Sequence, residues 1–158
     1  MPDVSLAQLV WTIPLFADVA VEEREKLLQY ALVDEFVEGH VLFHEGAIVG
    51  QHMYVILSGE VEILKKDKAG KDTVLATLRR SHFFGEMSLI EQEKRSATAR
   101  VKTKATILVI TRTNFDLMMK AAPAIANKML LVFVKTLSHR LRNTSDLYAS
   151  EHKGHVHL

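Results

Sequence analysis

The residue types best suited to ligand chemistry lie close together, within residues 84–99. Gly85 permits a tight turn, and free N–H groups at the start of a short helical turn after it can bind an anion. Arg95 follows nine residues after Glu86, and its planar guanidinium matches two phosphate oxygens, while Ser96 adds a hydroxyl donor. The Glu86 carboxylate is an acceptor suited to a ribose hydroxyl. Together these groups predict a site for a sugar phosphate.

Each residue of this stretch also has an ordinary structural explanation. A Gly-Glu pair is commonly a turn, and an Arg nine residues from a Glu often forms a salt bridge or lies in solvent. Glu86 could act as a general base in phosphodiester hydrolysis, but nothing in the sequence supplies the metal or activated water that this reaction normally needs. No Ser-His-Asp order or pair of catalytic carboxylates stands out. The sequence therefore predicts a binding protein rather than an enzyme.

Metal binding is the weaker interpretation of the histidines. His152, His155 and His157 could bind a transition metal, but a flexible tail explains them at least as well. The other histidines are scattered without the spacing of helical ligands. We therefore expect no metal and no cofactor.

The composition is that of a globular protein and narrows the class without giving the function. The 158 residues are 48% hydrophobic and 25% charged, which suits one domain with a real core. A net charge of +1 gives no global electrostatic footprint for DNA or RNA, and cysteine is absent. The longest apolar run, residues 129–134, is too short to cross a bilayer, and the N-terminus lacks a signal-peptide layout. We expect a cytoplasmic protein that does not span a membrane.

The character of the chain changes along its length. Residues 4–31 have a helical pattern, whereas residues 32–111 hold short apolar and β-branched runs between glycines, typical of a closed sandwich or jelly-roll barrel. Residues 114–150 are helical again, and 151–158 have the composition of a tail. We predict a single domain over 1–150, mainly β. Its fold is expected to be a double-stranded β-helix, a jelly-roll-like β-roll, with N-terminal helices and a long C-terminal helix.

The C-terminal helix carries an apolar seam that favours self-association. The seam residues are spaced 4-3-4-3-4, as in heptad repeats: Leu130, Val134, Leu137, Leu141, Thr144 and Tyr148. One alternative is that this stripe only packs on the β-roll. Because Leu131, Val132 and Phe133 form a second apolar face, one face can cover the domain while the other meets a partner helix. We expect a homodimer formed through this helix.

These stretches resemble the cyclic-nucleotide-binding domain of catabolite activator (Crp-Fnr) type regulators, cAMP-dependent protein kinase regulatory subunits and nucleotide-gated channels. The phosphate-binding cassette of that family reads Phe-Gly-Glu-(Leu/Met)-(Ala/Ser)-Leu, a short loop, then Arg-(Ser/Ala/Thr)-Ala-Thr. Residues 84–98 fit this pattern. Residues 15–16, 39–46 and 53–59 match supporting stretches, and the resemblance covers roughly residues 12–148. It implies the β-roll fold as a stand-alone domain.

The resemblance implies a role for each residue of the site. Glu86 would hold the ribose 2′-hydroxyl, and Arg95 would pair with the cyclic phosphate. Ser96 and the backbone N–H groups around Ser88 and Leu89 would complete the phosphate cradle, and two apolar side chains would flank the base. The residues expected to contact the ligand are Ile63 and Leu78 beside the base, then Phe84, Gly85, Glu86, Met87, Ser88, Leu89, Arg95, Ser96, Ala97, Thr144 and Ser145.

The resemblance assigns recognition of the base to the C-terminal helix. Thr144 and Ser145 match a Thr-Ser pair that reads the adenine amino group in the activator protein, with one residue contributed across the dimer. The match requires four extra residues after Pro123, and it favours cAMP, with cGMP as the alternative ligand. A second departure is Ser81-His82, which stands where the family usually has Gly-Asp and is expected to affect only a turn.

We therefore expect a regulatory domain that binds a cyclic nucleotide and signals through its C-terminal helix to an unidentified effector protein. One alternative is an interaction module that kept the fold and lost the nucleotide, although Glu86, Arg95 and Ser96 are intact. Another is the sensory part of a longer transcription regulator. The eight residues after Ser150 cannot make a winged helix, so no direct DNA binding by this chain is expected.

Overall fold

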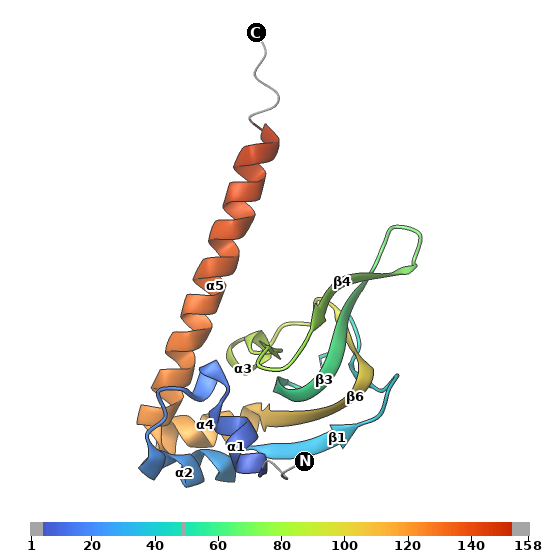
Figure 1. The fold of residues 1–158 in the computed structure, drawn as a ribbon. Coiled ribbons are helices and arrows are strands. Elements are labelled where there is room, and N and C mark those ends of the chain that lie inside the picture. The colour runs from blue at the N-terminus through green and yellow to red at the C-terminus, as the bar shows by residue number, and fades with distance from the viewer. Residues whose placement is uncertain (1–4, 49, 153–158) are drawn as a thin grey trace.

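The computed structural model describes residues 5–48 and 50–152, and its centre is a six-stranded antiparallel sheet curled into a roll (Figure 1). The strands are β1 (Leu32–Phe36), β2 (Val41–Phe43), β3 (His52–Lys66), β4 (Asp72–Leu78), β5 (Phe83–Phe84) and β6 (Thr98–Thr111). The main order is β1-β6-β3-β4, while β2 also pairs with β6 and β5 with β3. The predicted fold class, a mainly β roll with flanking helices and a long C-terminal helix, is confirmed.

The two long strands β3 and β6 are buried on both faces because two apolar clusters flank them. In β3, Met53, Val55 and Leu57 pack with helical residues, whereas the alternate side chains of Tyr54 and Ile56 face the interior of the roll. Alternation along a strand directs successive side chains to opposite faces. A continuous apolar run in β3 therefore serves both clusters.

Most of the helices gather at one end of the roll (Figure 1). They are α1 (Leu6–Trp11), the short 3-10 helices η1 (Pro14–Phe16) and η2 (Val21–Glu23), α2 (Arg24–Gln29), α3 (Met87–Ile90), α4 (Arg112–Ala121) and α5 (Pro123–His152). None of these helices is both long and apolar enough to span a membrane.

The C-terminal helical segment begins earlier than predicted and is divided in two. α4 starts at Arg112 rather than at residue 114, because the Thr111 hydroxyl accepts a hydrogen bond from the Asn114 N–H at 3.1 Å and caps the helix. Ala122 has a non-helical φ of −138° and separates α4 from α5. The division reflects Pro123, which disfavours a helical conformation of the residue before it.

The end of α5 also differs from the prediction. The helix continues to His152, two residues into the segment expected to be a tail. Residues 153–158, which include His155 and His157, lie outside the described residues. The division of the chain into one domain over 1–150 and a tail stays a prediction.

A tight turn closes the hairpin between β3 and β4. Asp67 donates its N–H to the Lys71 carbonyl at 2.8 Å, and its side chain accepts from the Ala69 N–H at 2.9 Å. Gly70 has φ of +78°, which glycine adopts without steric penalty. This hairpin projects from the body of the roll (Figure 1).

The turn before β5 contains Ser81 and His82, which stand where the family usually has Gly-Asp. Ser81 has φ of +77° and donates its N–H to the Ile56 carbonyl at 3.0 Å. The His82 ring nitrogen Nδ1 accepts from the Arg79 N–H at 2.9 Å, so it closes the turn as a carboxylate could. A non-glycine residue in the left-handed region costs about 1–2 kcal/mol. The departure thus affects a turn, as expected, and leaves local strain.

Ser81→Gly is therefore expected to raise the free energy of unfolding by about 0.5–1 kcal/mol, because relief of the left-handed strain exceeds the extra flexibility of glycine in the unfolded chain. Urea unfolding measures the change. The matched control is Ser58→Gly, at an exposed position in β3 without positive φ, where glycine should destabilise. Equal effects of the two substitutions would contradict the assignment of strain to Ser81.

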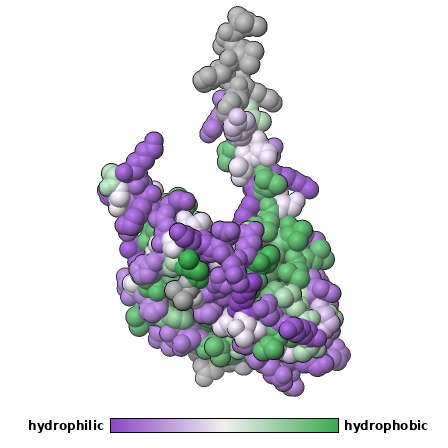
Figure 2. Space-filling view, turned by 180° about the vertical axis from the view of Figure 1, so that it is seen from behind, coloured by the Kyte–Doolittle hydropathy of each residue, from purple (hydrophilic) through white to green (hydrophobic). Residues whose placement is uncertain are grey.

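α5 is anchored by its first half and extends away from the domain with its second half (Figure 1). Its anchoring residues are buried: Ile125, Ala126, Met129 and Phe133. Further along, Val134, Leu141, Thr144 and Tyr148 of the predicted seam are exposed, whereas Leu130 and Leu137 are half-buried. Figure 2 shows hydrophobic side chains along the part of α5 that leaves the body. The seam as a whole therefore does not pack on the roll of its own chain.

Candidate ligand-binding site

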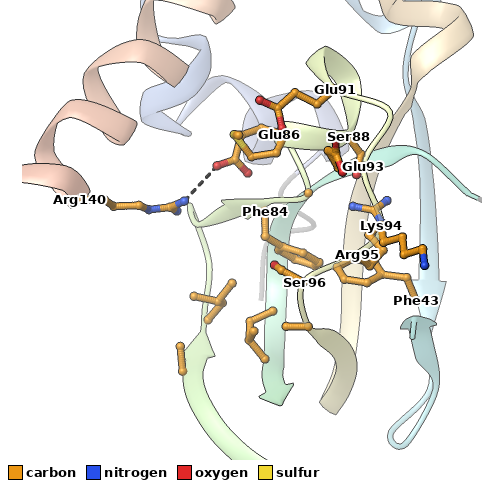
Figure 3. Close-up of a pocket in the computed structure, with 16 residues that line it drawn as sticks. Phe43, Phe84, Glu86, Ser88, Glu91, Glu93, Lys94, Arg95, Ser96 and Arg140 are labelled. Atoms are coloured by element: carbon orange, nitrogen blue, oxygen red, sulfur yellow. Dashed lines mark hydrogen bonds and ion pairs between the residues drawn. The ribbon is translucent and has the colours of Figure 1, made fainter. Parts of the chain in front are cut away.

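A cavity of about 420 Å³ opens between the roll, α3 and the segment that leads into β6 (Figure 3). Its size is in the range of small-molecule sites. Its lining combines an apolar wall from the strands with charged and polar groups from α3, the following segment and α5. The lining residues are Phe43, Ile63, Ala76, Leu78, Phe84, Gly85, Glu86, Met87, Ser88, Glu91, Glu93, Lys94, Arg95, Ser96, Ala97 and Arg140.

Arg95 is a buried cation at one side of this cavity. The residue is only 6% exposed, and its Nη2 donates to the carbonyls of Gly50 at 2.6 Å and His52 at 2.8 Å. Within residues 5–48 and 50–152 it forms no ion pair, and Nη1 and Nε have no acceptor. Burial lowers the pKa of Arg95, and the nearby Tyr54 and Glu86 partly offset that effect. The guanidinium keeps N–H donors for an anion.

Two backbone hydrogen bonds fix the chain at Arg95. Gly46 donates its N–H to the Arg95 carbonyl at 2.8 Å, and Arg95 donates its own N–H to the Ala47 carbonyl at 2.9 Å. On the other side, Gly85 has φ of +78°, and a Cβ there would lie 2.9 Å from Arg95 Nη1. The guanidinium can therefore pass this closely only because position 85 is glycine.

Glu86 is the buried acid of the site, and α5 supplies its partner. The residue is 3% exposed, and its Oε1 accepts from Arg140 Nη1 at 3.0 Å (Figure 3). The Arg140 side chain is 55% exposed, so solvent screens this ion pair in part. A carboxylate has about four acceptor sites, and one contact with Arg140 leaves others for a ligand hydroxyl.

The sequence model of the cyclic nucleotide-binding domain matches residues 33–122. The chain belongs to this family. The matched range runs from β1 to the end of α4, so it contains the roll, α3, Glu86 and Arg95. Arg140 and the rest of α5 lie beyond it.

Named relatives agree with the family assignment. The chain is 29% identical to the "Cyclic AMP receptor protein" of Thermus thermophilus over 124 residues, which are 78% of this chain and 57% of that protein. It is 35% identical to the "cAMP-dependent protein kinase regulatory subunit" of Yarrowia lipolytica over 105 residues, 66% of this chain and 27% of that protein. The chain spans about half the length of the first of these proteins and about a quarter of the second.

Solved structures in the family share the fold. A cyclic nucleotide-binding domain from Methylobacillus flagellatus superimposes with a TM-score of 0.77 at 26% identity, covering 92% of this chain and 81% of that one. The catabolite activator protein of Thermus thermophilus gives a TM-score of 0.73 at 27% identity, covering 85% of this chain and 63% of that one.

The structure brings most of the predicted site residues to the cavity of this family member. Those that line it are Ile63, Leu78, Phe84, Gly85, Glu86, Met87, Ser88, Arg95, Ser96 and Ala97. Leu89 does not, because its side chain is buried in the cluster between sheet and helices. Thr144 and Ser145 are exposed on α5 and do not line the cavity, and the Thr144 hydroxyl donates to the Arg140 carbonyl at 3.0 Å.

The backbone N–H groups expected to complete the phosphate cradle already have acceptors. Ser88 donates to the Gly85 carbonyl at 3.1 Å, and Leu89 donates to the Glu86 carbonyl at 3.0 Å. Both bonds close the helical turn itself. Only the N–H groups at the very start of such a turn lack an internal partner.

Several residues of the cavity were not predicted as site residues. They are Phe43, Ala76, Glu91, Glu93, Lys94 and Arg140. For Arg140 a signal existed, because it precedes Thr144 by one helical turn and so shares its face of α5. Within the described residues, no group of His, Cys, Asp and Glu side chains could hold a metal ion.

Proposed function

We propose that this chain is a cyclic-nucleotide sensor that binds cAMP in preference to cGMP. The observation that carries the proposal is the state of Arg95. This buried cation lines the cavity, and it has no ion-pair partner among the described residues. A buried charge is costly unless it is paired, so the site favours an anionic ligand. A cyclic phosphate supplies one negative charge and oxygen acceptors for Nη1 and Nε.

The other polar groups fit the sugar. Glu86, on the α3 side of the cavity, accepts a ribose hydroxyl with the oxygens that Arg140 leaves free. Ser96 lines the cavity next to Arg95 and donates its hydroxyl to the phosphate. Two opposite charges in one cavity suit a ligand that carries an anion at one end and hydroxyl donors beside it.

The base lies against the apolar wall and is read from α5. Ile63, Ala76 and Leu78 form that wall, and apolar surface suits the faces of a purine. The preference for adenine rests on the match of Thr144 and Ser145 to a Thr-Ser pair that reads adenine, and on relatives whose names include cyclic AMP. Since both residues lie outside the cavity, base recognition requires α5 to be docked or a partner helix to contribute.

The output of the sensor passes through α5. Its distal half exposes large apolar side chains, Leu141 and Leu147 among them, which a second copy of the helix covers in a homodimer. A ligand shifts such an equilibrium only through different contacts in the two states. Contacts of the base with Thr144 and Ser145 provide that difference, and an effector protein reads the position of the helix.

The ion pair between Glu86 and Arg140 connects α5 to the ligand, so its loss should weaken binding. We expect Arg140→Gln to lower cAMP affinity by about 3- to 10-fold, because the pair is only partly shielded from solvent. Isothermal titration measures the change. Arg142→Gln, an exposed arginine two residues further along α5, serves as the control and should leave affinity unchanged. Equal losses in both variants would mean that only the general charge of α5 matters.

The test of the function is titration of the purified chain with cAMP, cGMP and adenosine. Binding of cAMP that is tighter than binding of cGMP, with weak or no binding of adenosine, would support the proposal. Absence of heat with both cyclic nucleotides, together with no shift in melting temperature, would favour the nucleotide-free interaction module instead. Tighter binding of cGMP would overturn the assignment of Thr144 and Ser145 to adenine.

A further inference from the structure

An aromatic ring lies directly against the cation of the site. The Cζ of Arg95 is 4.0 Å from the centre of the Phe43 ring, and the two residues are 52 positions apart in the sequence (Figure 3). Phe43 ends β2, and it lines the same cavity. The roles proposed above for the ligand contacts do not require an aromatic residue at this position, since any apolar side chain would complete the wall.

We propose that Phe43 is a positioning residue for Arg95: its ring face holds the guanidinium so that Nη1 and Nε are presented to the phosphate. The proposal rests on the proposed function for its ligand, but the contact itself exists in the free protein. A cation over an aromatic face is attracted by the ring quadrupole, and the attraction is larger where water is excluded. Arg95 meets that condition because it is almost fully buried.

The geometry leaves the ring little freedom, which is what a positioning residue requires. Phe43 packs against Tyr54 at 5.7 Å and against Phe84 at 6.1 Å between ring centres. Tyr54 and Phe84 face each other across the pairing of β3 with β5 and stack at 5.1 Å with an angle of 14°. Three strands therefore supply one aromatic cluster, and Arg95 lies on its outer ring.

The hydrogen bonds of Arg95 show why the ring is needed in addition. The carbonyls of Gly50 and His52 bind only Nη2, so they fix one corner of the guanidinium. Rotation of the plane about that corner would turn Nη1 and Nε away from the cavity. Contact with the flat Phe43 ring restricts that rotation, because a planar guanidinium stacks favourably on an aromatic face.

The affinity test compares substitutions that keep or remove the ring. Phe43→Leu is expected to weaken cAMP binding by about 5- to 30-fold, whereas Phe43→Tyr should stay within about 3-fold of the natural chain. The control is Phe36→Leu, a half-buried ring of the same core cluster that does not line the cavity, and it should leave affinity unchanged. Equal losses for Phe43→Leu and Phe43→Tyr, or for Phe36→Leu, would overturn the proposal.

A second measurement needs no ligand. In the NMR spectrum of the free protein, the ring current of Phe43 should shift the Arg95 Nε–H proton upfield. The shift should persist in Phe43→Tyr and Phe36→Leu and vanish in Phe43→Leu. An unshifted Arg95 proton in the natural chain would overturn the positioning role. Failure of that chain to bind cAMP would overturn the proposed function instead, so the two failures are distinguishable.

Discussion

Arg95→Ala is expected to reduce cAMP affinity by about 2–5 kcal/mol, which corresponds to roughly 30- to 5,000-fold. The substitution removes the buried cation that lacks an ion-pair partner among the described residues, and the phosphate charge would then be desolvated without compensation. Isothermal titration with cAMP measures the loss. Unchanged affinity would contradict the placement of the phosphate at Arg95.

Two further variants make the Arg95 experiment specific. Arg95→Lys keeps the charge but removes the planar fork and its contact with Phe43, so its affinity should fall between those of the natural chain and Arg95→Ala. Arg100→Gln removes an arginine from the adjoining strand β6 that is paired with Glu62 at 3.0 Å. This control should leave cAMP affinity unchanged, because Arg100 does not line the cavity.

The free energy of unfolding of Arg95→Ala tests the role of Arg95 independently of ligand affinity. In the free protein Arg95 is buried without an ion-pair partner in the described residues, and burial lowers its pKa, so the charge carries a desolvation cost. The same residue donates two hydrogen bonds to carbonyls, which oppose that cost. The loss in affinity of Arg95→Ala should therefore exceed its loss in unfolding free energy, as expected for a residue kept for its ligand.

Most of the cavity residues that the sequence predicted belong to one local motif, and Ile63 and Leu78 are the two that do not. Gly85, Glu86 and Arg95 lie within eleven residues, so a turn and a short connection suffice to bring them together. All three residues line the cavity. The alternation of apolar residues predicted strands with a buried face but not the register in which they pair.

The rest of the site depends on packing between distant segments. Phe43 reaches Arg95 only because β2 pairs with β6, and Arg140 reaches Glu86 only because α5 passes beside the start of α3. No local pattern announces either contact. Leu89 is a separate case, because the resemblance implies a role for its backbone N–H only, while its side chain packs in the core cluster. The motif identifies the segment but not which of its side chains point inward.

The helix boundaries and helix surroundings also depend on single contacts and on packing that the sequence pattern does not encode. The start of α4 depends on one hydrogen bond, which the Asn114 N–H donates to the Thr111 hydroxyl. Thr111 is also the last residue of β6, so its sequence pattern indicates a strand rather than a helix cap. The exposed position of Thr144 and Ser145 depends on how far α5 extends from the domain. Apolar periodicity predicts that a helix has a face but not which neighbour covers it.

Gly85→Ala is expected to destabilise the fold by about 2–4 kcal/mol and to weaken cAMP binding. About 1–2 kcal/mol comes from placing a side chain at φ of +78°, and the remainder from contacts that the new Cβ would make. That Cβ would lie 2.7 Å from the His52 carbonyl oxygen and 2.9 Å from Arg95 Nη1. Relief of these contacts requires the guanidinium to move, which is why affinity should fall together with stability.

Gly70→Ala separates the two causes. Gly70 has the same φ of +78°, but nothing lies within 4 Å of a Cβ at that position, and the turn is far from Arg95 along the hairpin. Urea unfolding should therefore show a loss of about 1–2 kcal/mol, with cAMP affinity unchanged. The difference in unfolding free energy and cAMP affinity between Gly85→Ala and Gly70→Ala therefore measures the effect of the close contact between Arg95 and position 85. Equal destabilisation with equal affinity would mean that Gly85 serves only the turn and that the guanidinium is free to adjust.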